Sequence, residues 1–404
     1  MSALRTLDDI LDDVKGRRVF VRVDFNVPLD GGRVMDATRI KEALPTIREL
    51  LGAGAKVVLA SHCGRPKGQV KPEMSLRPAA EKLAELLGQT VPFAQDCIGD
   101  PARQTVKKLG AGEVAVLENL RFHAGETKND AEFADALAEL ADVYVDDAFG
   151  TAHRAHASTF GVADRVEIKA AGRLLVREVE ALSSLLGQPA KPFVGVLGGA
   201  KIEGKLDTLE NLLPRLDVLL LGGGMANTFL VARGHDVAKS LYEPERVNLA
   251  KEIMARADEA NTEIILPADV IVADSLDDPT LILSLPLITD PAPNAIPEGR
   301  MALDIGELAR KRFGEVCRSA GTLFWNGPLG VFERPPFDDG TQAVAESLGE
   351  CPGFTVIGGG ETVAAVHRAG VADKLSHVST GGGASLELLA GKKLPGVAAL
   401  EVES

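Results

Sequence analysis

The sequence predicts an α/β protein with two doubly wound, Rossmann-like parallel-sheet domains joined by a helical hinge. The chain has 404 residues, 45% of them hydrophobic. That is too long for one ordinary core, so two domains of about 150–200 residues are expected. Apolar runs typical of buried parallel strands alternate with amphipathic stretches typical of helices nearly throughout. This alternation favours parallel sheets flanked by helices.

The first half contains four predicted strands with amphipathic segments between them. The amphipathic segments "TRIKEALPTIRELL" (38–51) and "DAEFADALAELA" (130–141) predict helices. The strands are predicted from the apolar runs "RRVFVRVDF" (17–25), "AKVVLASH" (55–62), "EVAVLEN" (113–119) and "DVYVDDAF" (142–149).

The second half repeats this rhythm, and each predicted strand is a short apolar run. The runs are "PFVGVLGG" (192–199), "DVLLLGG" (217–223), "TEIILPADVIVAD" (262–274), "TLFWNG" (322–327), "FTVIGGG" (354–360) and "HVSTGGG" (377–383).

The junction between the halves is expected within "AAGRLLVREVEALSSLLGQPAKP", residues 170–192. Its middle has helical spacing, and Gly187, Pro189 and Pro192 end the pattern. A helical connector between two sheet domains suits a hinge. An ordinary surface helix explains the same pattern equally well.

Bulk properties exclude several classes of protein. The net charge of −14 argues against a nucleic-acid binder, because phosphate-backbone affinity depends on many basic contacts. No apolar run approaches the ~18 residues of a membrane span, and the first residues lack the apolar core of a signal peptide. The four cysteines lie far apart without a CxxC motif. Reduced thiols, a cytoplasmic location and no zinc site are therefore expected.

The two halves differ in the chemistry that follows their strands, where open parallel sheets bind ligands. In the first half, the segments after the strands carry four histidines and three arginines: His62, His123, His153, His156, Arg65, Arg121 and Arg154. Arginine binds carboxylate and phosphate through a planar fork, so several converging arginines indicate a multiply charged small acid. Singly, each arginine is more often part of a surface ion pair.

In the second half, the strands end in five glycine clusters, which let backbone N–H groups approach a phosphate. One cluster alone indicates little, because glycine also closes turns. Lys201 and Lys205 follow the first cluster at i,i+4 spacing, so if both lie on one helix they share a face. A solvated lysine pair is the alternative to an anion site. Glu333 and Glu361 in these clusters are interpreted either as ligands for magnesium or a ribose hydroxyl, or as solvated carboxylates.

The segment "GGAKIEGKL" (198–206) fits the phosphate-loop pattern G-x-x-x-x-G-K-[ST] except at its last position. Gly199, Gly204 and Lys205 match, but Leu206 stands where a hydroxyl would hold magnesium. No G-x-G-x-x-G is present, which argues against a dinucleotide dehydrogenase. These features together indicate a two-domain phosphotransferase that binds nucleotide on one half and a small anion on the other.

Nine motifs together resemble those of the phosphoglycerate kinase family and occur in the family's order. They are "RVDFNVP" (22–28), "SHCGRP" (61–66), "ENLRFH" (118–123), "DDAFGTAHRAH" (146–156), "LGGAKIEGK" (197–205), "GGGMANTF" (222–229), "WNGPLGVFE" (325–333), "GGGET" (358–362) and "STGGGASLELL" (379–389). The resemblance therefore covers essentially the whole chain. It implies phosphoryl transfer between 1,3-bisphosphoglycerate and ADP, which yields 3-phosphoglycerate and ATP, with Mg²⁺, in a monomeric cytoplasmic enzyme of glycolysis.

The resemblance also assigns roles to residues. A phosphoglycerate-binding site is implied for Asp24, Asn26, Arg39, His62, Arg65, Arg121 and Arg154. A nucleotide site is implied for Lys201, Lys205, Gly222, Gly223, Asn326, Pro328, Glu333, Gly359, Gly360, Glu361 and Thr362, with Glu361 as the metal carboxylate. Arg39, Lys201, Lys205 and Gly381 are expected to act in catalysis, with Gly381–Gly383 supporting the transferring phosphoryl group. The resemblance also implies that a carboxylate elsewhere holds the metal, so the metal needs no hydroxyl ligand at position 206, where Leu206 stands.

The expected domains follow from the resemblance and the junction together. They are a phosphoglycerate-binding domain (1–171), a helical hinge (172–189), a nucleotide-binding domain (190–390) and a tail (391–404) that packs on the amino-terminal domain.

Three positions depart from the usual family pattern. Glu361 stands where Asp is typical, which either shifts metal preference or is absorbed by the loop. Asp146 replaces a customary Asn and adds negative charge near an anionic substrate, unless it pairs with a neighbouring cation. Cys63 replaces a usual Leu, and either nearby cations lower its pKa or it is a buried, inert thiol.

Two other functions remain as alternatives. One is a nucleotide-dependent binding or regulatory protein that has lost turnover, which intact Arg39, Lys201 and Lys205 argue against. The other is a kinase for a different acid, which the match at His62 and the arginines argues against.

Overall fold

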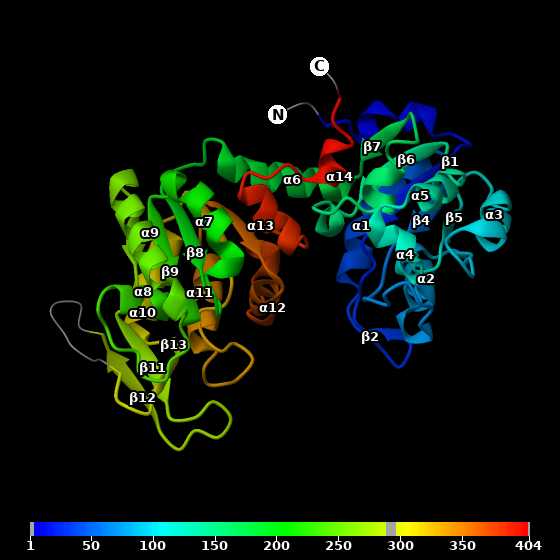
Figure 1. Cartoon of the computed structure of the whole chain (residues 1–404). Coiled ribbons are helices and arrows are strands. Elements are labelled where there is room, and N and C mark those ends of the chain that lie inside the picture. The colour runs from blue at the N-terminus through cyan, green and yellow to red at the C-terminus, as the bar shows by residue number, and fades with distance from the viewer. Residues whose placement is uncertain (1–3, 288–295, 403–404) are drawn as a thin grey trace. The chain divides into compact units, whose positions relative to one another are not determined.

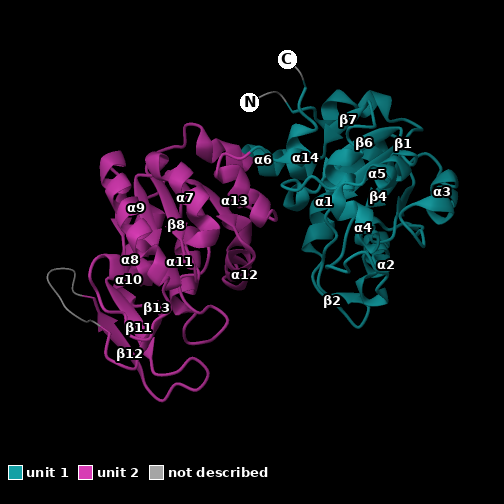
Figure 2. Cartoon of the chain, in the orientation of Figure 1, with its two compact units in different colours: residues 1–180, 393–404 teal, residues 181–392 magenta. Residues whose placement is uncertain are grey.

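The chain forms two units, each built around its own parallel sheet. Unit 1 comprises residues 1–180 and 393–404, and unit 2 comprises residues 181–392 (Figure 2). The structure is a computed structural model that describes residues 4–287 and 296–402. The predicted fold class is confirmed, because both main sheets are parallel and carry helices between their strands (Figure 1).

Unit 1 contains a five-stranded parallel sheet in the order β5-β4-β1-β6-β7. Nearly every strand residue is buried, as parallel strands covered on both faces require. The strands are β1 (Arg18–Val23), β4 (Lys56–Ala60), β5 (Val114–Val116), β6 (Val143–Asp147) and β7 (Lys169–Ala171), with a hairpin of β2 (Leu29–Asp30) and β3 (Arg33–Val34). The helices are α1 (Thr38–Gly52), α2 (Arg77–Leu87), α3 (Gly99–Lys107), α4 (Ala124–Lys128), α5 (Ala131–Ala138) and α14 (Pro395–Ala398).

The last segment of the chain packs on unit 1. Leu400 accepts a hydrogen bond from the backbone N–H of Arg5 (3.2 Å), and Gly396 donates one to the carbonyl of Ala152 (2.8 Å). A Cβ at Gly396 would lie 3.0 Å from Ala152, so this position favours glycine. The segment therefore contacts the loop that carries Arg154. Of the predicted tail, residues 403–404 lie outside the described residues.

Unit 2 contains a six-stranded parallel sheet in the order β10-β9-β8-β14-β15-β16. Its strands are β8 (Phe193–Leu197), β9 (Val218–Leu221), β10 (Glu263–Ile265), β14 (Thr322–Asn326), β15 (Phe354–Gly358) and β16 (His377–Val378). Its helices are α7 (Leu206–Leu212), α8 (Gly223–Ala232), α9 (Val247–Ala260), α10 (Glu307–Arg318), α11 (Asp339–Leu348), α12 (Gly360–Arg368) and α13 (Gly383–Leu389). The predicted strand ends therefore lie along one edge of one sheet.

A second, three-stranded antiparallel sheet in unit 2 was not predicted. It has the order β12-β11-β13, with β11 (Asp269–Ala273) between β12 (Ile282–Pro286) and β13 (Met301–Ile305). The sequence predicted one strand over residues 262–274. That strand is divided at Leu266–Ala268, and β10 joins the main sheet while β11 joins the small one. Pro267 lies in the break, since proline cannot donate to a sheet ladder.

Helix α6 (Arg173–Leu186) carries the chain from unit 1 into unit 2. Its first turn is held by Asp147 at the end of β6, because Asp147 Oδ1 accepts the N–H groups of Leu174 (2.8 Å) and Leu175 (3.2 Å). A carboxylate at a helix N-terminus satisfies orphan donors and complements the helix dipole.

Each unit has its own apolar core. In unit 1 the core includes Val21, Ile47 and Leu59, and in unit 2 it includes Phe313 and Trp325, all without exposed surface. Burying one such side chain contributes about 1.5–3 kcal/mol. Among the described residues, no helix is both long and apolar enough to cross a membrane.

Candidate active site

The carboxyl ends of four neighbouring strands in unit 1 carry the predicted anion-binding residues. Asp24 and Asn26 follow β1, His62 and Arg65 follow β4, Arg121 follows β5, and Arg154 follows β6. Because these strands are adjacent in the order β5-β4-β1-β6, the segments that follow them share one edge of the sheet. Arg39 reaches the same edge from the first turn of α1.

Arg39 is held by the loop after β1. Its Nη1 donates to Asp24 Oδ2 (2.9 Å) and to the carbonyl of Asn26 (3.2 Å). The Asn26 side chain in turn accepts the N–H of Gly64 (2.9 Å), which connects this loop to the one after β4. The Arg39 side chain keeps 35% of its surface exposed, so it remains available to a ligand.

His62 is buried, and Arg22 fixes its tautomer. The Nη2 of Arg22 lies 3.1 Å from His62 Nδ1. A guanidinium only donates hydrogen bonds, so Nδ1 accepts and the ring proton sits on Nε2. Burial and the charges of Arg22, Arg121 and Arg39 lower the pKa of His62 well below its usual value. The site thus holds a neutral imidazole with one N–H donor.

Arg22 was missed by the sequence analysis. It lies on β1 with no exposed surface, and its Nε donates to Ser158 Oγ (2.9 Å), which donates to Glu126 Oε1 (2.7 Å). The signal in the sequence is a charged residue inside an apolar strand, "RVFVRV". A buried charge of this kind requires partners, and Ser158 and His62 supply them.

Arg121 lies among other cations and retains an unpartnered donor. Its Nη1 donates to the carbonyl of Gly64 (2.9 Å), but its buried Nε has no partner among the described residues. Burial and the charges of Arg22 and Arg154 lower the pKa of Arg121 to about 10. Over residues 4–287 and 296–402, Arg65, Arg121 and Arg154 form no salt bridge with a carboxylate. Unneutralised arginines at one edge fit a multiply charged anion.

Two of the departures from the family pattern lie in this unit. Asp146 is fully buried, its Oδ1 accepts the N–H of Ala148 (2.9 Å), and burial raises its pKa to about 7. It forms no salt bridge within the described part of the chain, although it is in register with Arg22 on β1. Cys63 is 6% exposed, and burial followed by the charges of Glu118 and Asp24 raises its pKa, which favours an inert thiol.

In unit 2, the five glycine clusters follow β8, β9, β14, β15 and β16 at one edge of the sheet. Their glycines permit close backbone approach. A Cβ at Gly223 would lie 2.8 Å from the carbonyl oxygen of Gly199, and Gly223 has φ +63°. Gly222 and Gly359 are the N-caps of α8 and α12. These N-termini present N–H groups and a positive dipole end suited to phosphate.

Lys205 is half-buried among backbone carbonyls. Its Nζ donates to the carbonyls of Gly198 and Asn326, the latter at 3.0 Å. Burial lowers its pKa to about 8, and the charge of Glu361 opposes that shift. A Cβ at Gly327 would lie 2.2 Å from Nζ, so this lysine position requires glycine at 327. Within the described residues the Lys205 ammonium forms no ion pair with a carboxylate, which leaves its charge available to an anion.

Lys201 and Lys205 do not share a helix. Lys201 is exposed in the loop after β8, and Lys205 ends a short 3₁₀ turn (Glu203–Lys205) before α7. The shared helix face that the i,i+4 spacing would give on a single helix is therefore not formed. A regular α-helix begins only at Leu206, directly after Lys205.

The remaining nucleotide-site residues are held by the backbone around β14. Thr362 Oγ1 accepts the N–H of Gly327 (2.7 Å), and Asn326 Nδ2 is buried without a partner among the described residues. Gly381 is buried, and its N–H donates to Ser379 Oγ (3.1 Å), so that amide is already engaged.

A cavity of about 450 Å³ lies at this edge of unit 2. Four predicted residues line it: Gly223, Pro328, Glu333 and Glu361. The unpredicted antiparallel sheet supplies part of an apolar wall through Val270, Met301 and Leu303, and Leu276 and Leu329 extend it. Its size and mixed lining suit a ligand with an apolar ring and a charged end.

Glu361 is suited to a hard metal ion. It is exposed in the first turn of α12 and lines the cavity, so its carboxylate is accessible from solvent. Mg²⁺ is typically held by one or two carboxylates together with substrate phosphates. The donor chemistry at this position therefore fits Mg²⁺.

One parallel sheet carries a cluster of cations, and the other carries a glycine-edged cavity and, on the same sheet edge, a buried lysine. This combination is typical of a two-domain phosphotransferase. Comparisons with known proteins narrow this class. The family model described as phosphoglycerate kinase matches residues 7–392. The phosphoglycerate kinase of Pelotomaculum thermopropionicum is 52% identical over 398 residues, which cover 98% of this chain and 99% of that protein. That of Anaeromyxobacter sp. is 51% identical over 402 residues, with 99% and 100% covered.

Solved structures agree. Phosphoglycerate kinase from Coxiella burnetii matches with a TM-score of 0.87 at 40% identity, and covers 98% of this chain and 99% of its own. The enzyme from Pyrococcus horikoshii matches with a TM-score of 0.85 at 35% identity, with 98% of each chain covered. The chain belongs to the phosphoglycerate kinase family, as the nine motifs predicted.

Proposed function

We propose that this chain transfers a phosphoryl group between 1,3-bisphosphoglycerate and ADP, which forms 3-phosphoglycerate and ATP in glycolysis. The observation that carries the proposal is the family match over residues 7–392, which spans both the cation cluster and the glycine-edged cavity. Neither half by itself specifies this reaction, because anion sites and nucleotide cavities occur in many proteins.

Unit 1 is proposed to bind the phosphoglycerate through Asp24, Asn26, Arg39, His62, Arg65, Arg121 and Arg154. Three features of the described residues support this role: arginines that form no salt bridge with a carboxylate, the Nε of Arg121 without a hydrogen-bond partner, and the neutral His62 with its proton on Nε2. Arginine forks suit the substrate's phosphate and carboxylate, and the imidazole adds one N–H donor.

Unit 2 is proposed to bind ADP and ATP through Lys201, Lys205, Gly222, Gly223, Asn326, Pro328, Glu333, Gly359, Gly360, Glu361 and Thr362. The cavity's apolar wall would accept the base, and the buried ammonium of Lys205 would meet the phosphates. Glu361 would hold Mg²⁺, which supplies positive charge to the phosphate oxygens when bound.

The chemistry needs charge neutralisation rather than a general base. When ATP is consumed, the nucleophile is the substrate carboxylate, whose pKa of about 3.5 keeps it ionised at neutral pH. An anion must then approach a polyanion, and charge spreads over the equatorial oxygens in the transition state. Arg39, Lys201, Lys205 and the amides near Gly381 are proposed to neutralise that charge in an in-line transfer, each contributing about 3–4 kcal/mol to lowering the barrier.

The residues proposed to bind phosphoglycerate lie in unit 1, and those proposed to bind the nucleotide lie in unit 2. We therefore also propose that transfer requires domain closure that excludes water. Helix α6, which carries the chain from one unit to the other, is the proposed hinge. The chain is further proposed to act as a monomer in the cytoplasm on small-molecule substrates, without nucleic-acid or membrane partners. Its net charge of −14 supports the exclusion of nucleic acid.

The deciding experiment is a coupled NADH-oxidation assay with ATP, Mg²⁺ and 3-phosphoglycerate. We expect a turnover of at least about 1 per second, the lower end of the usual range of kinases. Nucleotide binding without turnover would favour the regulatory alternative. Faster turnover with another carboxylic acid in the same assay would favour a kinase of different specificity.

A further inference from the structure

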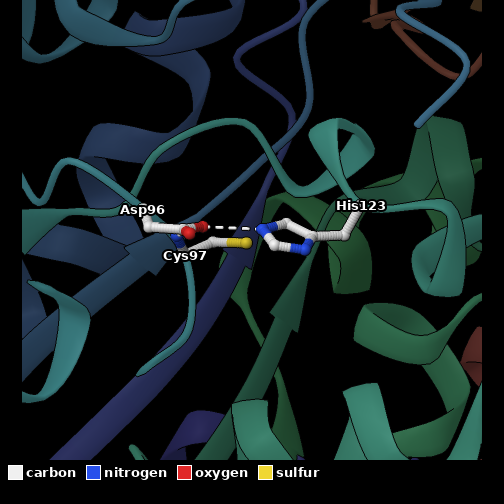
Figure 3. A group of neighbouring side chains, drawn as sticks. All are labelled: Asp96, Cys97 and His123. Carbon is white, nitrogen blue, oxygen red and sulfur yellow. Dashed lines mark hydrogen bonds and ion pairs between the residues drawn. The ribbon is translucent and has the colours of Figure 1, made fainter. Parts of the chain in front are cut away.

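Unit 1 contains a second group of ligating side chains that the proposed reaction does not use. Asp96 and Cys97 lie in the segment before α3, and His123 follows the turn Leu120–Phe122 and caps α4 (Figure 3). One potential ligand atom from each of the three residues lies within 4.8 Å of the other two. In Figure 3 the Cys97 sulfur and the Asp96 carboxylate both point toward the His123 ring.

The three side chains are held in place before any ion binds. Asp96 Oδ1 lies 2.7 Å from His123 Nε2 and also accepts the N–H of Cys97 at 2.7 Å. The His123 ring stacks on Phe133, with ring centroids 5.3 Å apart and an interplanar angle of 28°. Because packing and hydrogen bonds fix both the carboxylate and the imidazole, little side-chain freedom is lost when an ion binds.

The group is open to solvent on one side and closed on the other. Cys97 is fully buried, whereas the side chains of His123 and Asp96 are 32% and 40% exposed. An ion held by the three residues would therefore meet the sulfur on its buried side and the imidazole and the carboxylate on its exposed side. A water molecule can complete the coordination from the exposed side.

We propose that Asp96, Cys97 and His123 bind a divalent cation of the zinc class. Thiolate, imidazole and one carboxylate suit Zn²⁺ or Co²⁺, whereas Mg²⁺ and Ca²⁺ prefer oxygen ligands alone. Tetrahedral bonds of about 2.0–2.3 Å place neighbouring ligand atoms about 3.3–3.7 Å apart, so shifts of about 1 Å or less convert the present group into a coordination sphere. The expectation of no zinc site, drawn from the missing CxxC, is revised by this proposal.

The bonding change balances within the site and the solvent. The Cys97 S–H bond breaks, its proton goes to water, and a metal–sulfur bond forms. In the ion-free site the Nε2–H of His123 donates to the Asp96 carboxylate. When the ion binds, that proton passes from Nε2 to water and Nδ1 takes one up from water, so the neutral ring binds the ion through Nε2 with no net change in its protons. No oxidant or reductant takes part.

Metal binding would join two segments of unit 1 that the sequence separates by 26 positions. His123 directly follows the turn that carries Arg121, so the ion would brace the end of that turn. We therefore expect it to raise the melting temperature of unit 1, since a ligand that binds only the folded state stabilises that state. The proposal is independent of phosphoryl transfer.

The test is a Co²⁺ titration of the full, chelator-treated chain in excess Mg²⁺. We expect visible bands of tetrahedral Co²⁺ and a near-ultraviolet thiolate-to-cobalt band, with Zn²⁺ displacing both. Cys97→Ser should abolish the near-ultraviolet band, and His123→Gln should weaken Co²⁺ binding at least ~10-fold. The matched controls are Cys351→Ser and His367→Gln, which alter a thiol and an exposed imidazole in unit 2. They should leave the near-ultraviolet band and the Co²⁺ affinity unchanged.

Three results would overturn the proposal: no thiolate band in the wild type up to ~1 mM Co²⁺, a band that survives Cys97→Ser, or unchanged affinity in His123→Gln. Any of them would leave Asp96 and His123 as a hydrogen-bonded pair beside an inert thiol. Cys97 is buried, so its variant is first checked for a native circular dichroism melt. If it fails to fold, the partly exposed His123 decides the question.

Discussion

The lowered pKa of Lys205 predicts that replacing this residue has opposite effects on the stability of the chain and on nucleotide binding. Replacement of Lys205 with Met keeps an unbranched side chain of similar length and removes the buried charge. We expect Lys205→Met to stabilise the free chain at neutral pH and to weaken nucleotide binding. Both effects have one cause, because an ammonium that is poorly solvated among backbone carbonyls is well matched to phosphate.

The magnitude follows from the shift. A pKa lowered from 10.5 to about 8 corresponds to at most about 3.5 kcal/mol, at about 1.4 kcal/mol for each pKa unit. Between pH 8 and 10.5 the unfolded chain holds more protons at this residue than the folded chain does. The free energy of unfolding should therefore rise with pH in that window, by at most about 1.4 kcal/mol per pH unit. Below pH 8 both states are protonated, and the full penalty remains.

The assay is urea unfolding at pH 7, 8 and 9, followed by tryptophan fluorescence. Trp325 is the only tryptophan and is fully buried, with its indole N–H on the Gly327 carbonyl (2.8 Å), so it reports on unit 2 next to Lys205. The stability difference between Lys205→Met and the wild type should be largest at pH 7 and shrink as the pH rises. Lys201→Met, an exposed lysine in the same loop, should change stability by no more than about 0.5 kcal/mol.

Equal pH dependence in Lys205→Met and wild type would refute the reasoning, because it would mean that Lys205 is solvated in the folded chain. A second measurement uses the ligand. At pH 8 the wild type should take up about half a proton when it binds ADP, whereas Lys205→Met should take up none. Calorimetry in two buffers of different ionisation enthalpy measures that uptake.

The remaining predictions concern the proposed substrate groups and the departures from the family pattern. Arg39→Ala should lower kcat by at least ~100-fold while KM changes less, and steady-state kinetics with equal kcat and raised KM would show that Arg39 only binds ground-state substrate. Gly327→Ala should raise the KM for ADP at least ~10-fold. The backbone at Gly327 has φ +97°, and an added Cβ would lie 2.2 Å from Lys205 Nζ. An unchanged KM would argue against Lys205 as a phosphate ligand. Asp146→Asn should stabilise the chain above pH 7. Burial raises the pKa of Asp146 to about 7, so the wild type loses stability as the pH rises from about 4 to about 7. Identical pH profiles of wild type and variant in chemical unfolding would contradict this. X-ray scattering with both substrates bound should give a smaller radius of gyration, and an unchanged radius would exclude domain closure.

The sequence by itself determined the fold class and the chemistry at the strand ends. Buried parallel strands require continuous apolar runs, and such runs are visible locally, as in "RRVFVRVDF" and "PFVGVLGG". Parallel strands also end at a common edge, so the cations after β4, β5 and β6 and the glycines after β8, β9, β14, β15 and β16 could be grouped without coordinates. The family motifs added the identity of the reaction, which local patterns could not supply.

Only the tertiary structure decided how those residues are solvated and which distant ones meet. The pKa values of His62 and Lys205 depend on burial by elements far away in the sequence, and no periodicity encodes that burial. The same holds for Arg22, whose charge becomes a contact of His62 only when β1 and β4 pair. The central strand of the antiparallel sheet that walls the cavity, β11, lay in the same apolar run as β10, because a run shows that a strand is buried but not which sheet it joins.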